Sequence, residues 1–148
     1  MNTKKRAIGF YLSALAAVLG AAGVVFTVLG NNASPDNALG NISTLILAGV
    51  VGVLLAVVAS AASVSLGNHN IVSAVSVLGS IALYAYLFGS SVGQRVTLIA
   101  GLFSFNAGNV AGWQVFRMSI VAWVCLIVAM VVLVVSSFVK SVKVAQSA

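Results

Sequence analysis

This chain has 148 residues, of which 61% are hydrophobic and only 5% are charged, whereas about a quarter of the residues in a soluble domain are charged. Seven Lys and Arg residues stand against a single acidic residue, which gives a formal net charge of +6. The mean hydropathy of +1.19 excludes a water-soluble globular protein, and the length leaves room for one membrane domain over residues 1–148.

Four apolar runs without a charged side chain follow one another along the chain. Each is long enough, or nearly so, to cross a hydrocarbon core of about 30 Å as a helix. The runs are continuous rather than alternating, which is typical of helices and not of barrel strands. The sequence therefore predicts an all-α polytopic membrane protein, an antiparallel bundle of transmembrane helices at residues 7–29, 42–66, 71–88 and 118–139.

The first run follows the basic residues Lys4, Lys5 and Arg6. A secretory signal is the alternative interpretation, but its apolar region is about 7–15 residues long, so we expect this longer run to be retained as a helix. Small residues recur along it at spacings of four and three, a pattern that favours close helix packing in lipid. The pattern comprises Gly9, Ser13, Ala16, Gly20 and Gly23.

The second run, joined to the first by an outer loop at residues 30–41, repeats this pattern at Gly49, Gly52, Ala56 and Ala59. We call the small residues of the two runs the packing seam. Because the two runs are antiparallel neighbours, we expect the two halves of the packing seam to face each other.

The third run carries hydroxyl groups on one helical stripe, at Ser73, Ser76, Ser80 and Tyr84. Such hydroxyls bond to carbonyls of their own helix or of a neighbouring helix. The alternative is a polar path for water or a small solute. The stretch that follows, residues 89–117, is predicted as an apolar outer loop containing a short interfacial helix, with a re-entrant or partner-docking element as the alternative.

The distribution of basic residues predicts the orientation in the membrane. Five of them flank the terminal ends of the bundle, and the opposite side holds only two. This asymmetry favours both termini in the cytoplasm. The second outer loop is bracketed by the two remaining arginines, which mark the headgroup boundary or form an outer-face site with the one acidic residue. The residues of this outer-face site are Asp36, Arg95 and Arg117.

Groups that perform chemistry are scarce in this sequence. The predicted spans contain no ionisable residue of the kind that marks proton relays, ion pathways or voltage sensors. One His, one acidic residue and one Cys are too few for a metal site. We therefore expect no metal, no cofactor and no enzymatic activity. The basic residues flank helices, so we expect no nucleic-acid binding.

Residues 4–20, KKRAIGFYLSALAAVLG, resemble the start of small, functionally uncharacterised four-helix membrane proteins of Gram-positive bacteria. The resemblance implies a bacterial plasma membrane and no particular activity. From the residues we expect a non-catalytic accessory or scaffold subunit that contacts membrane lipid and other membrane subunits or copies of itself. The alternative is an oligomeric pore or facilitator for a small uncharged or anionic solute.

Overall fold

The structure, a computed structural model, describes residues 5–67, 70–139 and 142–143, so Lys4, His69 and Lys140 lie outside it. Four of its helices are long and apolar enough to cross a membrane, which confirms the predicted all-α membrane architecture. The elements in chain order are β1 (Lys5–Arg6), α1 (Ile8–Asn32), the 3-10 turn η1 (Pro35–Asn37), α2 (Ile42–Ser65), α3 (Ile71–Ser104), α4 (Val110–Phe138) and β2 (Val142–Lys143).

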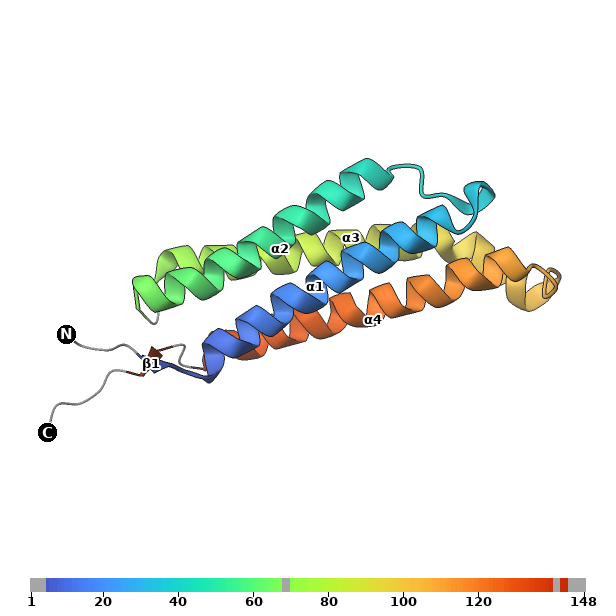
Figure 1. The fold of residues 1–148 in the computed structure, drawn as a ribbon. Helices are drawn as coiled ribbons and strands as arrows, with labels where there is room; N and C mark the ends of the chain where they lie inside the picture. The colour runs from blue at the N-terminus through green and yellow to red at the C-terminus, as the bar shows by residue number, and fades with distance from the viewer. Residues whose placement is uncertain (1–4, 68–69, 140–141, 144–148) are drawn as a thin grey trace, which may run out of the picture.

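The four helices lie side by side in one elongated bundle (Figure 1). Helix α1 packs against α2 and most extensively against α4, while α3 packs against α2 and less extensively against α4. The short strands β1 and β2 pair antiparallel at one end, with Lys5 opposite Lys143. We call this the terminal end, and the end that carries η1 and the α3–α4 connection the distal end (Figure 1).

The prediction of a loop over residues 89–117 is wrong, because most of this segment is helical. Helix α3 continues to Ser104 and α4 already begins at Val110, so the predicted interfacial helix is the last part of α3. Gly89, at which the sequence predicts an end to the third helix, is exposed and continues α3 instead. A glycine inside a helix costs only about 1 kcal/mol relative to alanine, and contacts between helices outweigh that cost here.

Helices α3 and α4 are longer than a membrane span requires. At 1.5 Å per residue, the 34 residues of α3 measure about 51 Å and the 29 residues of α4 about 44 Å, against a hydrocarbon core of about 30 Å. Arg95 lies about 36 Å along α3 from Ile71 on the same scale. The distance along α3 from Ile71 to Arg95 therefore exceeds the thickness of the hydrocarbon core.

The ends of the helices follow local chemistry. Gly67, just after α2, has a φ of +93°, a left-handed conformation that glycine adopts without steric cost. The side chain of Asn70 accepts a hydrogen bond from the Ser73 amide at 2.9 Å and so caps α3, and Asn109 caps α4 in the same way through Gly112.

The core of the bundle is a mixture of small and large side chains. Tyr84, Leu45, Leu87, Leu126 and Leu133 are fully buried together with alanines of all helices except α3. The outward faces carry exposed valine, leucine and isoleucine side chains along every helix. Lipid contact satisfies such faces, because a soluble protein rarely exposes so continuous an apolar surface.

Candidate functional site

Every residue of the packing seam is buried in the bundle. The two halves of the seam, however, do not simply face each other. A side chain added at Gly20 would meet Tyr84 of α3, and one added at Gly23 would meet Leu126 of α4 at 2.7 Å. A side chain added at Gly49 would meet α1 at Val24 and α3 at Leu87. The small residues thus make room for large side chains of other helices as well as for the α1–α2 contact.

The ring of Tyr84 occupies the centre of the bundle. It is fully buried, and it lies against the two glycines of the seam that face it, Gly20 on α1 and Gly52 on α2. An added Cβ at Gly52 would lie 2.9 Å from the ring edge, so neither glycine can be enlarged without moving the ring. Among the described residues the Tyr84 hydroxyl makes no hydrogen bond of standard geometry, although the Ser80 hydroxyl one turn earlier is close enough to interact with it. Shape therefore holds this side chain in place.

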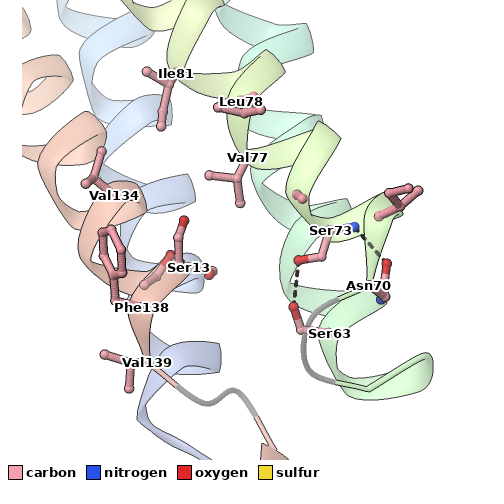
Figure 2. Close-up of a pocket in the computed structure, with 14 residues that line it drawn as sticks. Ser13, Ser63, Asn70, Ser73, Val77, Leu78, Ile81, Val134, Phe138 and Val139 are labelled. Carbon is pink, nitrogen blue, oxygen red and sulfur yellow. Dashed lines mark hydrogen bonds between the residues drawn. The ribbon is translucent and has the colours of Figure 1, made fainter.

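The hydroxyl stripe of α3 makes contacts to α2. Ser80 donates to the Gly52 carbonyl at 2.8 Å, and Ser73 donates to the Ala59 carbonyl at 3.1 Å. The hydroxyls of Ser73 and Ser63 also share a hydrogen bond of 2.8 Å (Figure 2). Ser76 is buried on the same helix. Ser73 and Ser80 bind α3 to α2 through these hydrogen bonds, and the fully buried ring of Tyr84 follows Ser80 one turn further along α3.

A cavity of about 670 Å³ lies at the terminal end of the bundle, between α3 and α4 (Figure 2). We call it the α3–α4 groove. Its apolar walls include Val77, Leu78 and Val134. Each of the four helices contributes a serine to its lining, at Ser13, Ser63, Ser73 and Ser136. This groove was not predicted from the sequence, in which its one sign is a serine near the same end of each helix.

At the distal end, the structure brings two of the three predicted outer-face residues together. Asp36 and Arg95 line a second cavity of about 370 Å³. Arg95 is only 2% exposed, and its Nη1 donates to the Asn37 carbonyl of η1, so a backbone oxygen rather than Asp36 holds the guanidinium. Arg117 is exposed on α4 and does not line this cavity.

Gln94 reinforces the contact that Arg95 makes. Its Oε1 accepts from the Gly40 amide at 2.9 Å, and its Nε2 donates to Asn41 Oδ1 at 2.7 Å. Two consecutive residues of α3 therefore hold the connection between α1 and α2 against the distal end. We call Gln94 and Arg95 the clasp. Its two donors bind the Asn41 side-chain oxygen and the Asn37 carbonyl, which is a structural arrangement.

An aromatic cluster marks the distal ends of α3 and α4. Phe103, Trp113 and Phe116 pack edge to face with ring centroids 5.1–5.7 Å apart. The Trp113 indole donates to the Ala107 carbonyl at 2.8 Å, which ties the α3–α4 connection to the cluster. Trp113 is the one ring of this cluster with a polar group, and amphipathic Trp side chains are typical of a membrane–water interface.

The part of the chain that the structure describes contains no group of three His, Cys, Asp or Glu side chains that could hold a metal ion. Cys125 is a free, half-buried thiol on α4. Comparison with known proteins finds no matching family model, no similar curated protein and no similar solved structure.

Proposed function

We propose that this protein is a non-catalytic scaffold or accessory subunit of a membrane assembly, formed by several copies of the chain or together with a larger membrane protein. The observation that carries the proposal is that residues inside the bundle are occupied by contacts between its own helices. Its small and hydroxyl-bearing residues, such as Gly20, Gly52 and Ser80, contact neighbouring helices. A packed interior leaves the outward surfaces as the parts that meet other molecules.

The distal end supports this proposal. Helices α3 and α4 exceed the length of a membrane span and end in the aromatic cluster. Phe105, directly after α3, is 86% exposed. Exposed apolar side chains beyond the hydrocarbon core are stabilised when a headgroup layer or a protein partner covers them. Gln94 and Arg95 hold the α1–α2 connection against this end through hydrogen bonds to Gly40 and Asn37.

We also propose a location in the plasma membrane of a bacterium, with both termini in the cytoplasm. The excess of basic residues before the first apolar run and after the fourth in the sequence supports this orientation. Asp36 and Asn106 line one cavity at the distal end, so the two connections expected outside lie together.

The alternative function is an oligomeric pore for an uncharged or anionic solute. Burial of Tyr84 in the centre of the bundle argues against a path through one protomer. A pore would therefore have to form between copies. This alternative requires solute flux by the purified protein, and the scaffold function does not.

Two measurements test the proposed function. Extraction of the protein from its native membrane into polymer-bounded lipid discs, followed by mass determination, should recover either several copies or a co-purifying membrane protein. Purified protein in liposomes should show no flux of glycerol, chloride or phosphate above protein-free liposomes. A single copy without a partner in the discs contradicts the scaffold function, and flux that depends on the protein favours the pore.

A further inference from the structure

Arg95 is a buried cation at the distal end that no carboxylate neutralises. Its side chain is only 2% exposed, and its guanidinium binds the Asn37 carbonyl rather than Asp36, the one acidic side chain of the chain. Burial of a charge is costly unless an opposite charge compensates it. A neutral carbonyl offsets only part of that cost, so the site favours an additional group of negative charge beside the guanidinium.

The hydrogen bonds of the guanidinium are also incomplete. Its Nη1 donates to Asn37, whereas Nε is buried and has no hydrogen-bond partner among the described residues. A guanidinium has five N–H donors in one plane and binds two oxygens of a single carboxylate or phosphate group with them. A buried donor without a partner is a place where a bound ion is expected.

The cavity of about 370 Å³ that Arg95 lines gives such an ion a route to it. We call it the distal cavity. Asp36, Thr97 and Asn106 are exposed residues of its lining, whereas Arg95 and Leu102 are buried. The cavity therefore combines a solvent-exposed polar rim with a buried cation, and a dissolved anion can enter it from water.

The lining of the distal cavity restricts the class of anion. Thr97, Asn106 and Asn109 bring a hydroxyl and two amide groups to it, and these groups donate to anionic oxygens. Asn109 caps α4 through its Oδ1, so its Nδ2 remains a donor for a ligand. Asp36 repels negative charge and so disfavours doubly charged anions such as sulfate. One cation and one nearby carboxylate suit an anion with a single charge.

We propose that the distal cavity binds a small organic acid with one carboxylate group. The two carboxylate oxygens bind the guanidinium of Arg95, and the amide groups of the lining donate to the same oxygens. The hydrocarbon part of the ligand lies against Leu98 and Leu102, which also line the cavity. A carboxylate matches this site because it is planar, presents two oxygens to arginine and carries one negative charge.

Thermal unfolding of the full-length protein in an uncharged detergent tests this site. The probes are sodium propionate, sodium phosphate and sodium chloride at equal ionic strength. We expect propionate to raise the melting temperature until the effect saturates, because a ligand that binds only the folded protein stabilises it. Chloride should give no saturable rise. The propionate concentration that gives half of the full rise, the half-effect concentration, measures the affinity.

Four variants separate ligand binding from a purely structural role of the arginine. Arg95→Gln removes the cation and should abolish the saturable rise. Its matched control, Arg117→Gln, lies outside the cavity and should respond like the parent. Asp36→Asn removes a repelling charge and should lower the half-effect concentration about threefold, whereas Asn106→Asp adds one and should raise it about threefold. A structural role alone predicts neither change.

The proposal is overturned if propionate gives no saturable rise, if chloride gives an equal one, or if Arg95→Gln responds like the parent. Phosphate raises the stability of many proteins without binding to a site, so its effect should be the same in Arg95→Gln as in the parent. A larger rise with phosphate that depends on Arg95 would assign the cavity to phosphate instead. If Arg95→Gln fails to fold, equal half-effect concentrations in Asp36→Asn and Asn106→Asp contradict the site.

Discussion

At the scale of single residues, Gly20 and Gly52 are small because Tyr84 needs the space beside them. Replacing either glycine with leucine should destabilise the bundle by about 1–3 kcal/mol, the usual cost of overpacking, measured as a lower melting temperature in detergent. Because both changes displace the same ring, the double variant should lose less than the sum of the two single losses. Val25→Leu and Val57→Leu are the controls.

Both control positions are exposed on the same two helices, so their larger side chains enter lipid or detergent. Equal losses at all four positions would contradict a special packing role for the two glycines.

The buried hydroxyl of Tyr84 gives a second prediction at this scale. A buried hydroxyl without a partner costs about 1–3 kcal/mol of desolvation, so Tyr84→Phe should leave the melting temperature unchanged or raise it. Tyr84→Ala removes the ring and leaves a cavity, with an expected loss of about 3–5 kcal/mol, as for other large aromatic residues. A clear loss of stability in Tyr84→Phe would mean that the hydroxyl is hydrogen-bonded in the folded protein.

At the scale of elements, the distal end depends on how α3 holds the connection between α1 and α2. Arg95→Gln removes the donor to the Asn37 carbonyl and should cost about 1–3 kcal/mol, because that carbonyl loses its partner. Amide hydrogen exchange of residues 36–41 should become faster. Arg117→Gln, at an exposed position, should change stability by less than about 0.5 kcal/mol.

Equal exchange rates in the two arginine variants would show that Arg95 does not anchor η1. The pair of variants also tests the predicted outer-face site. If Arg95→Gln and Arg117→Gln both lose a co-purifying partner while the protein stays folded, then the two arginines act in docking despite their separation on α3 and α4.

At the scale of the whole molecule, orientation follows from charge. A reporter fused after Ala148 should stay in the cytoplasm, and reporters inserted near Asp36 or Asn106 should be exported, because five basic residues precede the first apolar run or follow the fourth in the sequence and only two lie between the third and fourth runs. A periplasmic alkaline phosphatase and a cytoplasmic fluorescent protein, fused at the same sites, give opposite signals. Export of the fusion at Ala148 would invert the orientation.

The properties that depend on local composition could be predicted from the sequence alone. Apolar length and the absence of charge predicted all four helices, and the first two match α1 and α2 closely. The spacing of small residues marked Gly20 and Gly52 as buried, because a residue without a side chain matters only where another group approaches.

The length of α3 and the partners of the packing seam depend on contacts between residues far apart in the chain. The helix continues past Gly89 because Ser91, Gln94 and Arg95 have partners far away in the chain: Ser91 accepts from the Trp123 indole at 3.0 Å, and the other two hold the α1–α2 connection. Such partners cannot be predicted from the residues that neighbour them in the sequence. The α3–α4 groove has the same origin, since it arises where the weakest of the contacts between neighbouring helices leaves two of them apart.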